Sequence, residues 1–570
     1  MGRRSGWMRI AAAIVSGLLV AGAFPPLDFT WLVWVGMLPL LWALWSVEGK
    51  RAGWKGFGIG YLTGLVACLI QFNWVASVSW LGAILLPAYL ATYWGLFGIF
   101  AAKIGNPWKS GNRAGVLTVA FCHGAVWAGC ELLRGWVITG ISWNVLGTAF
   151  HDTPHLAQAA DLFGVVGLSM ALVFFQAVVV QAAVLRKLRP IVGAVAVIGM
   201  MSVYGRIRIQ MEDDAPSVRL KTLLVQLNIP QEADRVLWTA LQTHQGYEEE
   251  TTKALAALKS PDGQPSASWP DWVMWPEIAL TGWILNTLDG EKGMYQVNWD
   301  TISQVREAGP FTLFFGAAEG EAEDHGEGPI MNEKGASYNS LAVMSPTDEM
   351  QTYRKEHLVI FGETIPFLDT FPFLKKIYEE QAGAEYHGSF NPGTTFDPLP
   401  VAIGNTEVGA IPTICFEDSV PRLTRKFLRP GPQVIVNVTN DGWFKQSAAA
   451  DQHFQYARFR AIELRRPMLR CANSGVSAAI SSTGSTTHPD SWKSQILTDA
   501  TGSHFTRGSL LTELKIPLHP TFSLYALLGD TALALIATFG LFLPILQRKT
   551  LAKITGPDSD LNESNRHIAE

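Results

Sequence analysis

Long apolar runs separated by short polar loops dominate the first third of the chain. Seven of them lie near residues 10–24, 30–47, 57–76, 80–101, 115–137, 160–185 and 190–205, and an eighth lies near 521–546. Most are long enough to cross the roughly 30 Å hydrocarbon core of a bilayer, although the first is short and the seventh marginal. The pattern predicts a multi-pass α-helical membrane domain of about eight spans. The first run has features of a cleaved signal peptide, but the Pro25-Pro26 that leads straight into the second run favours a retained anchor.

Basic residues occupy every second loop between these runs. Lys and Arg cluster before the first run and after the second, fourth, sixth and eighth, whereas the loops at 25–29, 77–79 and 138–159 contain neither. Cytoplasmic loops of membrane proteins carry the excess of Lys and Arg. The alternation therefore predicts that both termini are cytoplasmic and that residues 207–520 lie on the outer face. A soluble domain of buried helices would have no reason to show it.

Between the seventh and eighth runs the pattern changes to short stretches rich in β-branched and aromatic residues. These predict strands at Leu220–Leu227, Trp272–Trp275, Phe311–Phe315, Ser340–Met344, Val408–Ile414, Val434–Val438, Val476–Ser481 and Leu510–Ile516. A helix is predicted over Ala448–Arg465, with one face formed by Phe454, Ala457, Ala461, Ile462 and Leu464. Alternating short strands and helices are typical of a layered α/β sandwich. The acidic, glycine-rich stretch Glu319–Gly335 is predicted to be a surface loop.

These patterns divide the chain into four parts: a membrane domain at 1–206, an outer α/β domain at 207–520, a C-terminal transmembrane helix at 521–546 and a polar cytoplasmic tail at 547–570. The formal charge is +9 through Arg206 and −14 in the remainder. Charged residues make up only 16% of the chain, against roughly 25% in an average soluble protein. With a net charge of −5, the composition excludes a disordered chain and a basic nucleic-acid-binding protein.

Three reactive side chains lie at the ends of predicted strands or in adjoining loops. Cys415 ends the run that begins at Val408, Glu277 follows Trp275-Pro276, and Lys355 precedes Phe361-Gly362-Glu363. A thiol needs a base or a cation nearby to become a nucleophile near neutral pH. A carboxylate can take its proton, and an ammonium can stabilise the oxyanion that develops. Taken singly, each residue also has an ordinary interpretation, a small buried cysteine or a solvated surface charge.

In this order and context, Glu277, Lys355 and Cys415 resemble the Glu–Lys–Cys triad of the nitrilase superfamily. The surrounding sequence more closely resembles one membrane-embedded branch, the apolipoprotein N-acyltransferases. The motifs that carry this resemblance are Tyr353–Glu363, Asn440–Phe444, Gln452-His453, Arg460–Glu463, Arg466-Pro467, Arg470, Asn473–Gly475, Phe24–Asp28 and Glu131–Arg134. Ile360 stands where the family usually has proline, and Phe416 where it often has tyrosine. The resemblance runs from about residue 10 to residue 546.

The resemblance implies a nitrilase-like αββα domain on the periplasmic face of a bacterial inner membrane. It implies an enzyme that takes an acyl chain from a phospholipid as a thioester on Cys415 and passes it to the α-amino group of the S-diacylglyceryl-cysteine of an apolipoprotein. Glu277 would be the base, and Lys355 with the backbone N–H of Phe416 would stabilise the oxyanion. Glu363 could orient Lys355, and Glu417 could position Glu277 or the amine, with a structural ion pair as the alternative for both.

The resemblance implies no metal and no cofactor. The five cysteines are scattered, and they lack the CxxC or Cys/His spacing of a zinc site and the even number of a disulfide framework. Two apolar features remain open. Trp238 is either part of the acyl or headgroup entrance or an ordinary packed aromatic residue, and Phe367–Tyr378 is a candidate lid or membrane-touching arm.

One charged feature lies inside an apolar run. Glu131 and Arg134, at i and i+3 in the fifth run, are either functional or snorkel to the outer interface.

Two other functions fit the same motifs. A membrane-anchored amidase of the nitrilase type would use the same triad with water in place of the amine, but a soluble substrate needs only one anchor. A non-catalytic membrane scaffold would be free to lose at least one triad residue, so the presence of all three argues against it.

Overall fold

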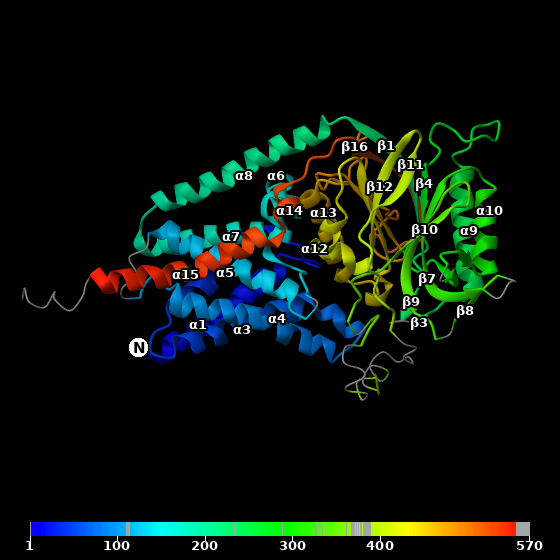
Figure 1. Ribbon diagram of the computed structural model, residues 1–570. Helices are drawn as coiled ribbons and strands as arrows, with labels where there is room; N and C mark the ends of the chain where they lie inside the picture. Colours follow the sequence, from blue (N-terminus) through cyan, green and yellow to red (C-terminus); the bar gives the residue numbers. More distant parts are fainter. Residues whose placement is uncertain are drawn as a thin grey trace, which may run out of the picture.

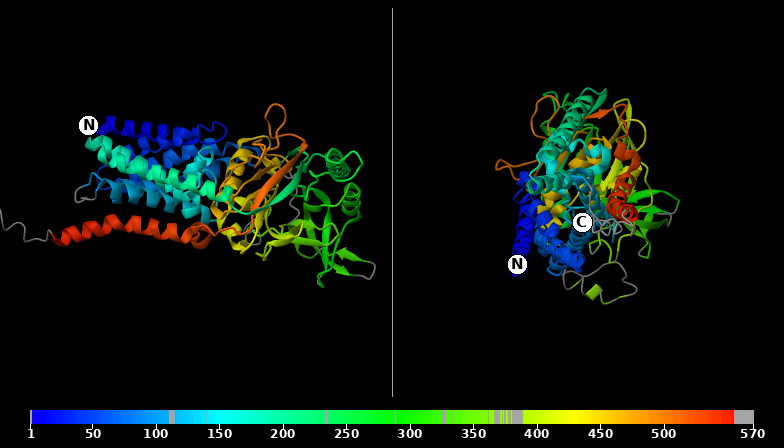
Figure 2. Two further views of the ribbon diagram at one scale, coloured as in Figure 1. Left: turned by 90° about the horizontal axis from the view of Figure 1, so that it is seen from above. Right: turned by 90° about the vertical axis from the view of Figure 1, so that its left-hand side faces the viewer.

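The computed structural model consists of a helical bundle and an α/β sandwich placed end to end (Figure 1). It describes residues 2–554 except 110–114, 139, 233–234, 288, 325–327, 333, 361, 366–370, 372, 374, 377–378 and 380–388. The arrangement confirms the predicted fold class. The first described helix begins, and the last one ends, at the end of the bundle that is far from the sheets, as the view from above in Figure 2 also shows.

The predicted apolar runs form the helices of the bundle. These are α1 (Gly2–Gly22), η1 (Thr30–Trp34), α2 (Leu38–Trp45), α3 (Ala52–Gln71), α4 (Gly82–Ile99), α5 (Val116–Trp136), α7 (Ala160–Leu185), α8 (Arg189–Asp213) and α15 (Asp530–Ile554). Within the described part of the chain, six of them are long and apolar enough to cross a membrane: α3, α4 with its continuation η3 (Phe100–Ile104), α5, α7, α8 and α15. The first two runs form shorter apolar helices.

Two helix boundaries differ from the prediction. The seventh run continues beyond residue 205, so that α8 ends at Asp213, close to the first strand of the sandwich. The eighth begins at Asp530 rather than near residue 521, because Gly529 adopts a φ of +56° and separates α15 from the short helix α14 (Leu524–Leu528).

Two sheets form the sandwich. The first has the strand order β10-β9-β7-β4-β1-β16, with β5, β6 and β8 beside this path, and the second has the order β11-β12-β13-β14-β15. The first sheet contains β1 (Ser217–Gln226), β4 (Trp272–Met274), β5 (Leu280–Thr287), β6 (Lys292–Met294), β7 (Thr312–Asp324), β8 (Pro329–Met331), β9 (Ser337–Met344), β10 (Met350–Arg354) and β16 (Gly508–Pro517). The second contains β11 (Leu399–Ile403), β12 (Thr406–Ile414), β13 (Gln433–Thr439), β14 (Met468–Ala472) and β15 (Ala478–Ile480).

Parallel pairing of neighbouring strands places their carboxyl ends side by side in each sheet. β1, β4 and β7 are parallel neighbours in the first sheet, and β12, β13 and β14 are parallel neighbours in the second. Apolar side chains of both sheets, such as Phe314 and Val436, share the core between them. The carboxyl ends of the parallel strands of each sheet therefore meet at one edge.

Helices cover both outer faces of the sandwich (Figure 1). α9 (Ala240–Ala256) and α10 (Gln296–Arg306) lie on the outer face of the first sheet. α13 (Ala448–Leu464) lies between the second sheet and the bundle, begins with a cap from Ser447 and is followed by Arg465, the C-cap residue, in the left-handed conformation. This confirms the predicted helix, but Ile462 packs with the bundle core while Phe454 packs with the sheets.

The prediction of a surface loop at Glu319–Gly335 is wrong at two places. Residues 319–324 continue β7, where Glu319 is fully buried, and Pro329–Met331 form β8. The Glu319 carboxylate accepts hydrogen bonds from Ser340 Oγ at 2.7 Å and from Arg354 Nε at 2.9 Å, so the acidic composition does not require solvent. The polar tail beyond residue 554 and much of the candidate lid Phe367–Tyr378 lie outside the described residues.

Candidate functional site

Cys415 occupies a sharp turn at the carboxyl end of β12. It is the first residue of η5 (Cys415–Ser419), and its φ of +52° is one that L side chains rarely adopt. Strain of this kind concentrates at functional sites, where the surrounding structure holds it in place. Cys415 is half-buried, whereas the other cysteines, Cys68, Cys122, Cys130 and Cys471, are buried. Cys415 is therefore the cysteine that a ligand can reach.

Glu277 and Lys355 approach this turn from the first sheet. Glu277 follows β4 and Lys355 follows β10. Lys355 Nζ lies 3.5 Å from Glu277 Oε1, and both charges act on the Cys415 thiol. Lys355 and Glu277 are only 1% and 7% exposed, so their charges interact with little screening by water. The structure thus brings together the three residues that the sequence singled out.

Asn339 and Glu363 complete this cluster. Asn339 Nδ2 donates to Glu277 Oε1 at 2.8 Å and to Glu363 Oε1 at 2.7 Å. Glu363 Oε2 lies 2.8 Å from Lys355 Nζ and accepts from the Val359 N–H at 3.0 Å. Sequence reasoning missed Asn339, which directly precedes the predicted strand Ser340–Met344 and stands among the polar residues Ser337 and Ser340.

Burial sets the protonation states of the cluster. Burial raises the pKa of Glu277; Lys355 opposes this shift and Glu363 adds to it. Burial disfavours the charged form of Lys355, but the negative charges of Glu363 and Glu277 outweigh the effect of burial and raise the pKa of Lys355. Burial and then the Glu277 charge raise the pKa of the Cys415 thiol. The resting thiol is therefore protonated near neutral pH, and a carboxylate of raised basicity lies beside it.

Glu417 ties the Cys415 turn to the loop that follows Lys355. Its Oε1 accepts hydrogen bonds from the Tyr353 hydroxyl at 2.9 Å and from the N–H groups of Glu356 and His357 at 2.8 and 2.9 Å. Its Oε2 accepts from the Ile414 N–H at 2.8 Å. Burial raises the pKa of Glu417 to about 7, against the opposing charge of Lys355. Glu417 therefore tethers the end of β10 to the end of β12.

Aromatic rings line the side of the site that faces the bundle. The Phe416 ring stacks on Trp143 and on His357, with centroids 6.0 Å apart in both pairs. Trp143 lies in the loop that follows α5 and also contacts the rings of Trp74 and Phe444, at 5.3 and 6.3 Å. The membrane region and the sandwich therefore share an apolar wall beside the nucleophile turn.

The charges of the fifth apolar run hold the loop that carries this wall. Glu131 and Arg134 are each 4% exposed, which excludes snorkelling to the interface. Glu131 Oε1 accepts from Trp127 Nε1 at 3.0 Å and from the Leu146 N–H at 2.9 Å. Arg134 Nη2 donates to the carbonyl oxygen of Trp143 at 2.8 Å. The pair therefore fixes both ends of the segment that presents Trp143.

Trp238 lies in a different layer of the sandwich. It packs against the core on the outer face of the first sheet, where a Cβ on Gly246 of α9 would come within 3.1 Å of its ring. This is the environment of a packed aromatic residue. A place for Trp238 at the acyl or headgroup entrance stays a prediction.

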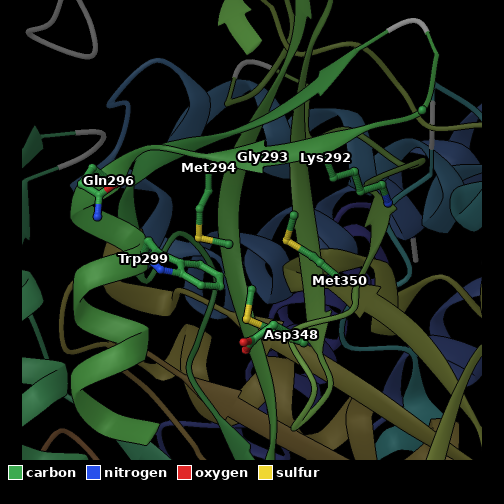
Figure 3. Close-up of a pocket in the computed structure, with 9 residues that line it drawn as sticks. Lys292, Gly293, Met294, Gln296, Trp299, Asp348 and Met350 are labelled. Atoms are coloured by element: carbon green, nitrogen blue, oxygen red, sulfur yellow. The ribbon is translucent and has the colours of Figure 1, made fainter. Parts of the chain in front are cut away.

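A cavity of about 540 Å³ opens on the outer layer of the first sheet, between β6, α10 and the ends of β9 and β10. Figure 3 shows Met294, Trp299 and Met350 around it, with Lys292 and Asp348 at its rim. Glu277, Lys355 and Cys415 do not line it. This cavity is therefore separate from the candidate site.

One cluster of potential metal ligands, formed by Asp28, His151 and Asp152, lies outside the candidate site. His151 Nε2 lies 3.2 Å from Asp28 Oδ1, and its Nδ1 lies 2.9 Å from Asp152 Oδ1. Burial opposes a charge on His151, but Asp152 and Asp28 outweigh it and raise its pKa. Both ring nitrogens of His151 face carboxylate oxygens, and the raised pKa favours an ion pair within the cluster.

Comparison with known proteins places both regions in known families. Residues 16–178 match the apolipoprotein N-acyltransferase N-terminal domain, and residues 224–502 match the carbon-nitrogen hydrolase family. The solved structures that are similar include an amidase from Nesterenkonia sp. (14% identity, TM-score 0.31, covering 54% of this chain and 92% of that one). A carbon-nitrogen hydrolase from Helicobacter pylori is similar at 12% identity and a TM-score of 0.31, covering 52% of this chain and 89% of that one.

Curated relatives match over nearly the whole chain. The apolipoprotein N-acyltransferase of Geobacter metallireducens is 30% identical over 83% of this chain and 85% of its own length. That of Bradyrhizobium diazoefficiens is 29% identical over 95% of this chain and 96% of its own length. The chain therefore belongs to the apolipoprotein N-acyltransferase family.

Proposed function

We propose that this protein is an N-acyltransferase of a bacterial inner membrane. It moves an acyl chain from a phospholipid to the α-amino group of the S-diacylglyceryl-cysteine of an apolipoprotein. The observation that carries the proposal is the position of Cys415, beside Glu277 and Lys355 on one side and beside the aromatic wall of the bundle on the other. A lipid ester can approach a thiol at this boundary without leaving apolar surroundings.

In the first half-reaction Cys415 takes up the acyl chain. Glu277 accepts the thiol proton, and the thiolate attacks the carbonyl carbon of the phospholipid ester. Lys355, together with the backbone N–H of Phe416, stabilises the tetrahedral oxyanion, and Glu363 holds Lys355 charged through its 2.8 Å ion pair. The intermediate collapses to a thioester, and Glu277 returns the proton to the alcohol of the departing lysophospholipid.

In the second half-reaction the amine replaces the thiol. The α-amino group attacks the thioester carbonyl, Glu277 takes a proton from the nitrogen, and the Cys415 thiolate leaves and is reprotonated. Water competes poorly in a site lined by Trp143 and Phe416, which favours transfer over hydrolysis.

We also propose the topology that this chemistry requires. Residues 1–206 form the membrane domain, 207–520 the catalytic domain on the periplasmic face, 521–546 the last transmembrane segment and 547–570 a cytoplasmic tail. The alternation of Lys and Arg between loops supports this orientation, as does the common location of both described chain ends far from the sheets.

An acyl-transfer assay on the purified protein tests the proposed function. The protein is incubated with phospholipid labelled in its acyl chains and a synthetic peptide that begins with S-diacylglyceryl-cysteine. We expect the label to appear in amide linkage on the peptide. A protein that releases only free fatty acid, or that hydrolyses amides without acylating the peptide, would be an amidase, and a protein inactive in both assays would be a scaffold.

A further inference from the structure

A second group of charged residues lies buried next to the nucleophile turn. His453 of α13 places its Nε2 2.8 Å from Asp418 Oδ1 and its Nδ1 2.8 Å from Asp441 Oδ1. Arg470 of β14 contacts the same two carboxylates, at 3.3 Å from Asp418 and 2.8 Å from Asp441. None of the four side chains is more than 1% exposed. The mechanism proposed above uses none of them.

One residue joins this quartet of His453, Asp418, Asp441 and Arg470 to the nucleophile. Asn437 Nδ2 donates to the Cys415 carbonyl at 3.1 Å, and Asn437 Oδ1 accepts from Arg470 Nη1 at 3.0 Å. Asp418 also belongs to η5, the turn that Cys415 begins. Burial, Glu277 and Lys355 have the largest effects on the pKa of the Cys415 thiol. The next largest comes from the Asp441 carboxylate, which raises that pKa. The charges of the quartet therefore reach the reacting sulfur.

The quartet is electrically balanced only when His453 carries a proton. Two carboxylates face one guanidinium, so a neutral His453 leaves one buried negative charge without a partner, which is costly. Both ring nitrogens lie within hydrogen-bond distance of carboxylate oxygens, the geometry of a double donor. Arg470 Nη2 lies 3.0 Å from His453 Nδ1 and donates to Asp441 Oδ2 at 2.8 Å, so both cations share the Asp441 carboxylate. Burial and the Arg470 charge oppose a charge on His453 and lower its pKa. The carboxylates of Asp418 and Asp441 outweigh both effects and raise the pKa of His453 to about 9.

We propose that His453 is a positioning residue for acylation of Cys415. As an imidazolium it neutralises, together with Arg470, the carboxylates of Asp418 and Asp441, so that the thiolate and the oxyanion form without an unbalanced negative charge beside them. This inference rests on the proposed function, because it assigns a role within that reaction. The groups that face His453 are Asp418 of η5, Asp441 of η7 (Asp441–Phe444), Arg470 of β14 and the Trp143 ring, 5.3 Å away on the loop that follows α5.

His453→Gln tests the charge while keeping a polar side chain. The measurement is the single-turnover rate of thioester formation on Cys415 with labelled phospholipid. We expect this rate to fall at least about tenfold, less than the ~10²–10³ typical of removing a direct oxyanion donor. The matched control is His244→Gln in α9, because His244 is also buried, at 3% exposed, but its hydrogen bonds join it to the hydroxyls of Thr301 and Thr281 and to the Thr281 N–H rather than to carboxylates. Equal rates in the two variants would overturn the proposal.

A second substitution separates charge balance from packing. Asp418→Asn combined with His453→Gln leaves the neutral pair of Asp441 and Arg470, 2.8 Å apart. We expect the double variant to form the thioester several-fold faster than His453→Gln alone. If the histidine serves only to fill space and bond its neighbours, the second substitution slows the reaction further, and the proposal is wrong.

The pH dependence of unfolding gives a readout that does not require activity. Because the pKa of His453 is raised from 6.5 to about 9, its contribution to stability is full below pH 6.5 and is lost as the pH rises through 9. We expect the melting temperature of the wild type to fall more steeply over this interval than that of His453→Gln. Identical slopes would contradict an imidazolium. If the wild type forms no thioester but the slopes differ, the proposed function fails while the charge assignment stands.

Discussion

At the scale of the residue, the proposed chemistry depends on which of two cysteines in the sandwich carries the acyl group. Cys415 is strained and half-buried, whereas Cys471 lies fully buried in β14. Its Sγ sits 3.4 Å from the Val225 carbonyl oxygen and 3.3 Å from that of Met274. A buried thiol that already donates to backbone carbonyls is a packing residue rather than a nucleophile.

Substituting each cysteine separates these roles. We expect Cys471→Ser to keep substantial activity, because a hydroxyl can donate to the same two carbonyls, and Cys415→Ala to abolish acyl transfer. Both variants are compared with the wild type in the lipopeptide assay. Loss of activity in Cys471→Ser with retention in Cys415→Ala would reverse the assignment of the nucleophile.

Asn339→Asp places a third carboxylate against Glu277 and Glu363, in place of the amide that now donates to both. Like charges at this distance disfavour ionisation of Glu277 and disturb Lys355. We expect the acylation rate of Cys415 to fall by ~10²-fold or more, comparable with loss of an oxyanion donor. Asn298→Asp is the control, since Asn298 is equally buried but bonds the backbone of Gly282. A similar loss of acylation in a folded Asn298→Asp protein would contradict a specific role for Asn339.

Motifs made Glu277, Lys355 and Cys415 predictable because each is a reactive side chain in a distinctive sequence context. Asn339 and Trp143 were not, because an amide within a strand and a tryptophan in an apolar loop carry no chemical signature of their own. Their importance comes from contacts with residues distant in the sequence, such as the 2.8 Å bond from Asn339 to Glu277. Such contacts are set by the tertiary fold.

At the scale of the element, α13 joins the sandwich to the bundle through a buried ion pair. Arg465, at its end, donates Nε and Nη2 to Asp161 Oδ2 of α7 at 3.0 and 2.6 Å. Arg208 Nε of α8 donates to the same oxygen at 3.1 Å. Asp161 therefore connects three helices at the junction of the two domains.

Removing the Asp161 charge should weaken this junction strongly. Asp161→Asn leaves the fully buried Arg465 without its counter-ion, which typically costs about 3–5 kcal/mol. The comparison is Asp490→Asn, because Asp490 pairs with Arg219 on the exposed surface, where an ion pair adds little to stability. The free energy of unfolding in detergent micelles distinguishes the two variants. Equal losses would mean that the junction does not depend on Asp161.

Hydrophobic periodicity predicted the apolar helices and the strands β1, β4, β7, β9, β12, β13, β15 and β16, because their side chains face lipid or a packed core. It missed β5, β6, β8, β10, β11 and β14, and in two places a buried charge interrupts the pattern. β14 was missed because Arg470 stands in its centre, and the end of β7 was assigned to a loop because Glu319 and Glu321 suggested solvent. In both strands a partner from elsewhere neutralises the charge, Asp441 for Arg470 and Arg354 for Glu319.

At the scale of the whole molecule, the first and last described helices begin and end on the side of the bundle that is far from the sheets (Figures 1 and 2). Reporter fusions test the orientation that this arrangement and the loop charges support. We expect fusions after residue 110 or 550 to report the cytoplasm, and fusions near 150 or 330 to report the outer compartment. A cytoplasmic signal at 330 would place the site on the side of the membrane where a lipoprotein acceptor is absent.

The most direct test of the account is the covalent state of Cys415. The purified protein is exposed to phospholipid without an acceptor, and its intact mass is measured before and after hydroxylamine and after addition of the diacylated lipopeptide. We predict a mass increase of one acyl group in the wild type, removed by either reagent, and none in Cys415→Ala or Glu277→Gln, because the thiol is absent or keeps its proton. A wild type that transfers acyl chains yet shows no thioester, even at the earliest resolvable times, would contradict the covalent mechanism.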